Sequence, residues 1–323
     1  MGRPLTEPTR PREPTMDRLI ITDVSPRDGL QNQPKAVSAQ DKLRLIDCLV
    51  SAGVRSVEAT SFVSPKAVPQ MADASEVLSA LLVRQPELRS SVLVPNLKGL
   101  ERAHAAGARE IAVVLAATET MNQKNINMSL QQAAEVSEQT VLAARGHGMK
   151  TRAYIAVAFD CPFEGATALE RVMALSQRML DAGADELVIA DTIGSASPGM
   201  VRDRVRALLE QVPSDKLALH FHDTRGMGAA NAWAAVEQGV RRFDASTGGI
   251  GGCPFAPGAA GNVATEDLVL MAERSGLATG IDLMALLNAV DLAEALLGRP
   301  LGGRSAPWLR RQRDKAREPA MPS

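Results

Sequence analysis

Two histidines separated by a single residue are the first groups in this sequence that could do chemistry together. His220 and His222 lie in the stretch LALHFH, which has the apolar composition of a buried strand. Residues two apart on a strand point to the same face, so both imidazoles would face one place. Such a pair can bind a divalent metal ion, or it can be two hydrogen-bonded histidines at a polar end of the fold. His104 and His147 fall on predicted helices or loops, and we interpret them as structural.

Polar side chains also stand where other predicted strands end. The stretch SPRDGLQ follows a predicted strand at 19–24, and similar positions recur along the chain. The carboxyl ends of parallel strands meet at one face of a fold, so these residues are expected to gather there. The candidates are Arg27, Asp28, Gln31, Glu58, Asp191, Cys253 and Asn262.

Asp28 is the natural third ligand, because a carboxylate beside two imidazoles is a common site for a divalent cation. With an added amide, this donor set suits a harder ion than a cysteine-rich site does. Mg²⁺ or Mn²⁺ is the expected ion, while Zn²⁺ and Fe²⁺ stay open. Four protein ligands would leave two positions of a six-fold shell for a chelating substrate.

Three charged residues near these ligands each have two interpretations. Arg27 is either a structural ion-pair partner or a group that stabilises a developing oxyanion. Glu58 and Asp191 either orient the ligands or Arg27, or accept a proton themselves. The spacing of the residues does not decide between these roles.

The segment GGIGGCPFAPGAAGN at 248–262 follows the last predicted strand. It lacks the GxxxxGK[ST] pattern of a phosphate-binding loop. Glycine-rich loops are often merely flexible, and a lone cysteine such as Cys253 is often inert. Its place after the last strand nevertheless makes this segment a candidate lid over the site.

A recurring pattern indicates which elements must position these residues. A helix-like stretch ends in a glycine, and a short turn then leads into a strand-like run; the glycines are Gly53, Gly107, Gly183 and Gly239. Glycine commonly caps helix ends because it accepts the left-handed conformation. Repeated helix-to-strand passages are typical of a parallel sheet with crossover helices.

The predicted strands number eight, which favours an α/β fold of the (β/α)8 TIM-barrel type. They cover 19–24, 55–60, 91–95, 110–116, 152–159, 186–191, 217–222 and 242–246. A doubly wound open sheet is the alternative, but no GxGxxG follows the first strand. Ser38 and Asp41 fit a capping box at the start of one helix. Apolar helices at about 265–299 extend beyond the eighth strand.

Composition excludes several classes of protein. The chain has 323 residues, a formal net charge of −1 and 3% aromatic residues, so no basic patch or stacking platform indicates nucleic acid or a membrane surface. Three dispersed cysteines indicate a reducing compartment. We expect a disordered tail at 1–16, a barrel domain with appended helices at 17–302 and a solvated C-terminal tail at 303–323.

Seven segments together resemble the 3-hydroxy-3-methylglutaryl-CoA lyase family of the DRE-TIM metallolyase superfamily. The resemblance runs from about residue 18 to 300, and the glycine loop with its cysteine is its most specific part. The segments are SPRDGLQNQ, VEATSFVSPKAVPQM, PNLKGLE, QKNINMS, ADTIG, HFHDT and GGCPFAPGAAGNVATEDLV.

The resemblance implies a divalent-metal-dependent TIM-barrel enzyme that cleaves an acyl-CoA substrate to acetyl-CoA and acetoacetate. It implies Asp28, His220, His222 and Asn262 as metal ligands. It also implies that Arg27 stabilises the enolate, that Cys253 transfers a proton from the loop, and that Glu58 and Asp191 support the site. It also places four residues near the substrate: Gln31, Ser61, Asn125 and Arg152. We further expect a cytoplasmic homo-oligomer, a dimer or tetramer, with a place in leucine catabolism and ketone body formation.

The sequence departs from the family pattern just after the metal histidines. RGMGAAN follows HFHDT, so Arg225 and Met227 replace a tyrosine and a glutamine. Arg225 is therefore a further candidate for binding substrate, and it could alter acyl specificity. This leaves open the same chemistry on another 3-hydroxy-acyl-CoA or hydroxy acid. A condensing synthase of the superfamily and a non-catalytic barrel are the remaining alternatives.

Overall fold

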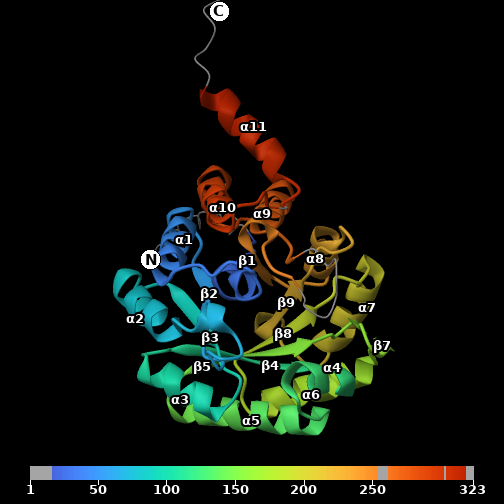
Figure 1. Cartoon of the computed structure of the whole chain (residues 1–323). Coiled ribbons are helices and arrows are strands. Elements are labelled where there is room, and N and C mark those ends of the chain that lie inside the picture. Colours follow the sequence, from blue (N-terminus) through green and yellow to red (C-terminus); the bar gives the residue numbers. More distant parts are fainter. Residues whose placement is uncertain (1–16, 253–260, 302, 318–323) are drawn as a thin grey trace, which may run out of the picture.

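Parallel strands close into a barrel, with helices around the outside (Figure 1). The computed structural model describes residues 17–252, 261–301 and 303–317. The barrel strands, in order around it, are β1 (Ile20–Asp23), β10 (Arg242–Ala245), β9 (Leu217–Phe221), β8 (Glu186–Asp191), β5 (Lys150–Ala156), β4 (Glu110–Ala116), β3 (Arg89–Leu93) and β2 (Ser56–Ser61). Because β1 pairs with both β10 and β2, the sheet closes on itself. The (β/α)8 expectation is confirmed, and the open doubly wound sheet is wrong.

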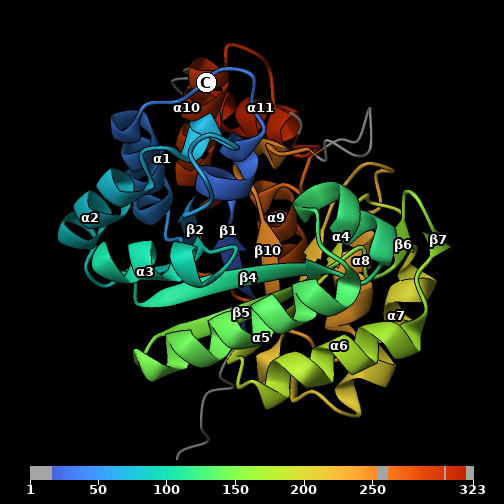
Figure 2. The same cartoon turned by 60° about the horizontal axis from the view of Figure 1, so that its bottom comes forward.

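Helices alternate with the strands and cover the barrel, as the turned view in Figure 2 also shows. They are α1 (Ala39–Ser51), α2 (Ala74–Arg84), α3 (Leu97–Ala105), α4 (Glu119–Ile126), α5 (Leu130–Gly146), α6 (Leu169–Asp181), α7 (Pro198–Leu209), α8 (Gly228–Val236), α9 (Thr265–Arg274), α10 (Leu283–Leu297) and α11 (Ala306–Arg317). Four single turns lie between them: η1 (Ser25–Gly29), η2 (Pro69–Met71), η3 (Ser214–Lys216) and η4 (Thr247–Gly249). None of the helices among these residues is long and apolar enough to cross a membrane.

Local sequence signals set the helix ends as expected. Ser38 is the N-cap of α1, and its side chain accepts a hydrogen bond from the Asp41 backbone N–H at 3.2 Å. The Ser38 hydroxyl in turn donates to the Asp41 carboxylate. The four glycines of the repeated pattern all have positive φ, between 89° and 102°, which glycine tolerates without strain. Each turn therefore leads the chain from a helix into the next barrel strand.

The barrel interior contains small apolar side chains together with polar ones. Ala112, Tyr154, Val188 and Ala218 form a buried cluster that is separate from the large apolar layer between strands and helices. Alanines at two of these four positions leave volume inside the barrel, and long charged side chains fill part of it. This mixed interior supports the active site from below.

The structure contains features that the sequence patterns do not reveal. A short antiparallel hairpin, β6 (Asp160–Cys161) with β7 (Gly165–Ala166), lies outside the barrel sheet. The C-terminal tail expected at 303–323 contains a helix, α11. Ala306 and Leu309 are buried against Leu283 and Leu287 of α10, and this apolar contact explains the helix. The predicted tail at 1–16 lies outside the described residues.

Candidate active site

A tight π-helical turn places Arg27 and Asp28 at the carboxyl end of β1. In η1 the backbone N–H groups of Arg27, Asp28 and Gly29 all contact the Val24 carbonyl oxygen, at 3.2, 2.8 and 3.2 Å. Pro26 suits the first turn because it lacks an N–H that would need a partner there. The turn therefore directs two adjacent charged side chains toward the barrel mouth.

Two carboxylates hold the Arg27 guanidinium. Its Nε and Nη2 contact Glu58 Oε2 at 2.6 and 2.5 Å, and Nη1 contacts Asp28 Oδ1 at 2.9 Å. Burial by itself would lower the pKa of Arg27, but the two carboxylates raise it well above its usual value. Arg27 is therefore a fixed cation. Burial raises the pKa of Glu58 despite the Arg27 charge.

Asp28, His220 and His222 converge on one point. A ligand atom from each lies within 4.8 Å of the others. His220 and His222 come from the end of β9 and the residue after it, and their ring centroids are 5.2 Å apart. Burial opposes ionisation of Asp28, yet Arg27 and the imidazoles lower its pKa overall. Burial and the neighbouring His220 lower the pKa of His222 to about 4.

A second segment brings Asn262 to the same point. His222 and Asn262 form an antiparallel bridge, flanked by hydrogen bonds from Asp223 N–H to the Gly261 carbonyl and from Val263 N–H to the Phe221 carbonyl. This pairing anchors the end of the glycine-rich segment beside β9. Asn262 Nδ2 then donates to Asp28 Oδ2 at 2.8 Å.

These four residues fit a divalent cation. His222 Nδ1 and Asn262 Oδ1 are buried, and neither atom has a hydrogen-bond partner among the described residues. Buried lone pairs without partners are costly, and a cation would satisfy them. Two imidazoles, a carboxylate and an amide oxygen form a donor set that binds divalent ions.

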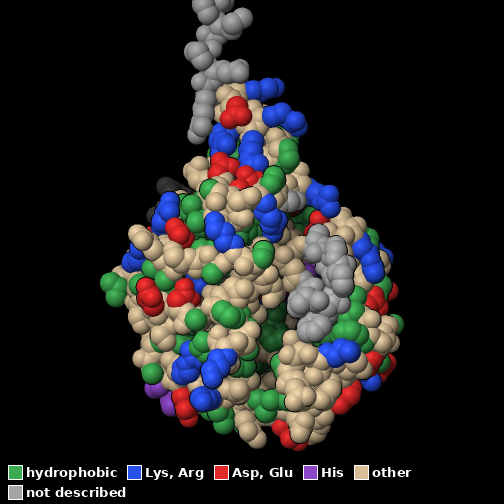
Figure 3. Space-filling model, in the orientation of Figure 1, with side chains coloured by type: hydrophobic (Ala, Val, Ile, Leu, Met, Phe, Trp, Pro, Cys, Tyr) green, Lys and Arg blue, Asp and Glu red, His purple; other side chains and the backbone are tan. Residues whose placement is uncertain are grey.

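Asp28, His220 and His222 open into a cavity of about 280 Å³ at the barrel mouth, where Figure 3 shows a hollow at the centre of the face. Six predicted site residues line it together: Arg27, Asp28, Gln31, Asn125, His220 and His222. Gln31 Oε1 is buried and has no partner among the described residues, so it is available to a ligand. The cavity also has an apolar part, lined by Val68, Val114 and Met121.

Glu58 and Asp191 differ in what they support. Glu58 orients Arg27 directly. The Asp191 carboxylate accepts from the backbone N–H groups of Ser195 and Ala196, at 2.9 and 3.0 Å, and so shapes the loop after β8. Burial raises its pKa. The Asp191 carbonyl also accepts from the His222 N–H at 3.3 Å, which links that loop to a candidate ligand.

Other candidates lie away from the cavity. Ser61 and Arg152 are buried and are not among its lining residues. Arg225 is exposed, and its Nη1 donates to the Ser195 carbonyl at 3.1 Å, beside the β8 and β9 loops. Cys253 lies outside the described residues.

Sequence patterns missed three residues that support the site. Asp23 ends β1, Tyr154 is the only tyrosine in the chain, and Asp244 lies on β10. Asp244 contacts His220, and Tyr154 lines the cavity. Each of these residues is a polar side chain on an otherwise apolar strand, and this is the one signal that the sequence offers. Two-residue periodicity also places Asp244 on the same face of β10 as Arg242.

Comparisons with known proteins converge on one family. The HMGL-like family model matches residues 18–293. A hydroxymethylglutaryl-CoA lyase of Bacillus subtilis is 41% identical over 292 residues, which cover 90% of this chain and 97% of that protein. An (R)-citramalyl-CoA lyase of Chloroflexus aurantiacus is 43% identical, covering 88% of this chain and 93% of the other.

Solved structures agree with this result. A hydroxymethylglutaryl-CoA lyase from Pseudomonas aeruginosa has a TM-score of 0.88 at 40% identity, covering 92% of this chain and 98% of the other. A lyase from Acinetobacter baumannii, solved with coenzyme A and 3-methylmalate, has a TM-score of 0.86 at 42% identity, covering 91% and 95%.

Proposed function

The chain belongs to the HMGL-like family of lyases, and from this premise we propose that it cleaves 3-hydroxy-3-methylglutaryl-CoA to acetyl-CoA and acetoacetate. The observation that carries the proposal is the cavity that Arg27 lines together with the Asp28, His220 and His222 cluster. A cation-binding cluster and a fixed arginine on one cavity wall are what a carbon–carbon cleavage beside a thioester needs.

The reaction is a retro-Claisen cleavage in which each electron pair has a destination. The tertiary hydroxyl at C3 loses its proton, its C–O bond becomes the ketone of acetoacetate, and the C2–C3 bond breaks. The electrons of that bond form the enolate of acetyl-CoA, which then takes a proton at carbon. Arg27 offsets the negative charge on the enolate oxygen, because Glu58 and Asp28 already hold its guanidinium in place.

The family implies a divalent metal, and we propose Mg²⁺ or Mn²⁺ held by Asp28, His220, His222 and Asn262. When bound, the cation supplies a Lewis acid that acidifies the substrate hydroxyl and orients the adjoining carboxylate. Gln31 and Asn125, which line the cavity, are proposed substrate contacts. We retain Cys253 as the proposed proton donor to the enolate carbon, since a thiol has a suitable pKa for that step.

A second candidate substrate is (R)-citramalyl-CoA, favoured by the 43% identity to the Chloroflexus aurantiacus lyase. Its carboxylate sits on the carbon that bears the hydroxyl, one methylene closer than in the first substrate. Cleavage would then give pyruvate in place of acetoacetate.

One assay separates the two substrates. Purified protein with Mg²⁺ or Mn²⁺ is given each acyl-CoA, and the ketone product is measured with NADH and either 3-hydroxybutyrate dehydrogenase or lactate dehydrogenase. The proposal expects acetoacetate formation at a higher kcat/KM than pyruvate formation. Asp28→Asn should abolish turnover, whereas the surface variant Asp47→Asn should retain it. Faster pyruvate formation would assign the second substrate, and no product from either would refute both.

We propose that residues 17–302 form the lyase domain, and that the protein acts as a cytoplasmic dimer or tetramer in leucine catabolism and ketone body formation. Light scattering after gel filtration measures the oligomeric state. Several mammalian relatives are named as mitochondrial, and fractionation of the source cells tests the location.

A further inference from the structure

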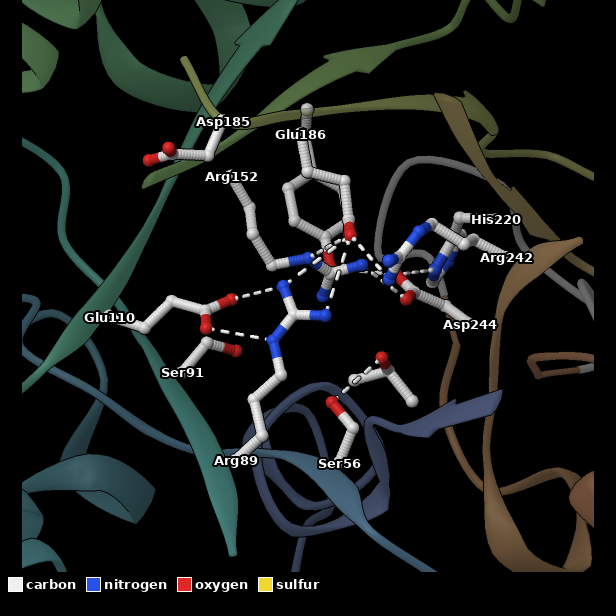
Figure 4. Close-up of polar contacts among 12 residues, drawn as sticks. Ser56, Arg89, Ser91, Glu110, Arg152, Asp185, Glu186, His220, Arg242 and Asp244 are labelled. Carbon is white, nitrogen blue, oxygen red and sulfur yellow. Dashed lines mark hydrogen bonds and ion pairs between the residues drawn. The ribbon is translucent and has the colours of Figure 1, made fainter. Parts of the chain in front are cut away.

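A chain of charged side chains fills the barrel interior beneath the active site (Figure 4). At one end Arg89 contacts Glu110 at 2.6 and 2.8 Å. Glu186 accepts hydrogen bonds from Arg242 at 3.2 Å and from Arg152 at 2.6 Å. The Glu110 and Glu186 side chains are only 6% exposed. Such a layer is unusual, because branched apolar side chains commonly fill this part of a barrel.

All three guanidinium nitrogens of Arg152 have hydrogen-bond partners inside the barrel. Its Nε donates to Glu186 Oε1 at 2.6 Å, its Nη1 to the Tyr154 hydroxyl at 2.9 Å and its Nη2 to Asp244 Oδ1 at 2.8 Å. The side chain is 2% exposed. All three nitrogens therefore already have partners, and Arg152 has a structural task within this layer.

Asp244 connects Arg152 to a candidate metal ligand. Its Oδ2 lies 3.3 Å from His220 Nδ1 and accepts from the Tyr154 hydroxyl at 2.6 Å. Its Oδ1 accepts from Arg152 Nη2 at 2.8 Å, so both carboxylate oxygens act as acceptors and the group is paired with a buried guanidinium, as an ionised carboxylate is. An ionised carboxylate only accepts hydrogen bonds, so Nδ1 of the neutral imidazole must carry the proton. The other ring nitrogen, Nε2, then keeps its lone pair.

His222 provides an internal comparison. Its Nδ1 has no hydrogen-bond partner among the described residues, so none of the described side chains fixes its proton by this route. The two imidazoles are thus held differently, although they come from the same strand end. An arrangement that fixes one ligand in a single tautomer would preorganise the cluster before any ion arrives.

We propose that Arg152 and Asp244 are positioning residues that lock His220 in its Nδ1–H tautomer, leaving Nε2 to bind the divalent cation. The inference rests on the metal site of the proposed function. It also moves Arg152 from the substrate contacts, where the family resemblance puts it, to a layer below them. Arg152 acts through Asp244, because a buried carboxylate needs a paired cation to stay ionised.

The Asp244→Asn variant tests the tautomer directly. Arg152 Nη2 donates toward the position of Oδ1, so the amide oxygen will turn to that side. The amide NH₂ then faces His220 Nδ1 and donates to it, which forces the proton onto Nε2. The variant keeps the shape of the side chain, and its NH₂ group faces both groups that Oδ2 contacts, His220 Nδ1 and the Tyr154 hydroxyl, so it reverses the direction of both hydrogen bonds.

Long-range ¹H–¹⁵N spectra of metal-free protein labelled with ¹⁵N-histidine will read this change, since the chain has only four histidines. His220→Gln assigns the resonances. We expect the Nδ1–H form of His220 in the original protein and the Nε2–H form in Asp244→Asn. Calorimetric titration should show a Kd for Mn²⁺ weaker by about 10- to 100-fold in the variant.

Glu110→Gln is the matched control. It removes a carboxylate of the same buried layer that pairs with Arg89. It should keep the tautomer of His220 and bind Mn²⁺ within about twofold of the original protein. Arg152→Lys retains a cation, so it should weaken Mn²⁺ binding less than Asp244→Asn does. Circular dichroism and melting curves check that each variant is folded. If Asp244→Asn does not fold, the test rests on Arg152→Lys.

An unchanged tautomer and an unchanged Mn²⁺ Kd in folded Asp244→Asn would overturn the inference. Equal losses in Glu110→Gln and Asp244→Asn would also overturn it, because they would indicate general destabilisation. None of these measurements uses turnover. If the original protein failed to cleave either acyl-CoA, the proposed function would fall while the tautomer result stood by itself.

Discussion

Two neighbouring carboxylates hold the Arg27 guanidinium without using all of its N–H donors. Its contacts to Glu58 and Asp28 engage Nε, Nη1 and Nη2. A guanidinium has five N–H donors, so donors beyond those three contacts can face the cavity that Arg27 lines. A cation fixed before the reaction stabilises developing charge without the cost of reorganising.

Replacing Arg27 by glutamine should therefore slow the chemical step. We expect kcat to fall by about 10²- to 10³-fold, or on the order of 3 kcal/mol, because one preorganised donor group is lost. Steady-state kinetics at saturating Mg²⁺ and substrate measures it, with Asp47→Asn as the surface control. A kcat equal to that of the original protein would remove Arg27 from the mechanism.

Glu266 should make stability depend on pH. The side chain is buried on α9, and its Oε2 accepts from the Gly248 N–H at 3.0 Å. Burial, assisted by Asp267, raises its pKa to about 8. The folded protein thus keeps a proton that the unfolded chain releases near its ordinary pKa of about 4.5. The stabilisation is complete below that ordinary value and is lost as the pH rises to about 8.

The Glu266→Gln variant should flatten that profile. The free energy of unfolding of the variant minus that of the original protein should be larger at pH 8 than at pH 5, because only the original protein loses stability as the pH rises. Urea unfolding curves at several pH values between 5 and 8 give the two slopes. If both proteins lose stability with pH at the same rate, Glu266 does not hold the proton.

At the scale of elements, the end of β1 is tied to the segments on either side of the glycine-rich loop. Asp23 Oδ1 accepts from the Ser25 N–H at 2.9 Å, and Oδ2 accepts from the hydroxyls of Thr247 and Thr265, both at 2.7 Å. Ser25 begins η1, Thr247 begins η4 and Thr265 begins α9. One buried carboxylate thus fixes the position of the segment that carries Asp28 relative to the segment that carries Asn262.

Asp23→Asn should therefore affect stability and metal affinity together. An amide has one acceptor oxygen in place of two, so at least one of these buried donors loses its partner, at a cost of about 1–3 kcal/mol. Calorimetry should also show weaker Mn²⁺ binding. In the control Asp47→Asn, which breaks an exposed pair with Arg84, the loss should stay within about 1 kcal/mol. Stability reduced with Mn²⁺ affinity unchanged would mean that Asp23 supports the fold alone.

The sequence predicts the elements well wherever the signal is local. Ser38 and the glycine turns mark where helices begin and end. Runs of mostly apolar residues mark strands, such as Glu110–Ala116, at their observed bounds. The π-helical turn at Ser25–Gly29 has no comparable local pattern. The sequence does not predict helix α11, because its charged residues outnumber its apolar ones and its order depends on contacts with α10.

The residues of the site are likewise predictable where the signal is local, and not where it depends on contacts between distant parts of the chain. Asp28, His220 and His222 could be found because each one lies at or just after the end of a strand. Arg152 and Asp244 lie 92 residues apart, and their contact exists only because the barrel closes. Proximity of this kind depends on strand order and register, which periodicity alone does not give.

At the scale of the whole molecule, the candidate metal ligands join separate parts of the barrel. Asp28 follows β1, the histidines lie at the end of β9, and Asn262 follows β10. The unfolded chain has no such cluster, so a bound cation stabilises the folded state by mass action.

Adding Mg²⁺ or Mn²⁺ should therefore raise the melting temperature, and EDTA should reverse the rise. At a concentration 100 times the Kd, the gain is about 2.7 kcal/mol for one site. Asp28→Asn should lose most of the increase, while Asp47→Asn should keep it. Differential scanning fluorimetry across a metal titration measures the shifts, and an equal shift in both variants would place the ion elsewhere.

The pairing of β1 with β10 also has a consequence for biosynthesis. Asp28 and Asn262 are separated by 234 positions. At translation rates of about 5–20 residues per second, the first emerges roughly 10–50 s before the second. During that interval the first strand has no neighbour on one side and the nascent polypeptide cannot chelate an ion. Metal capture must therefore follow release of nearly the entire chain from the ribosome, so a shortage of the cation would act on finished barrels and not on growing ones.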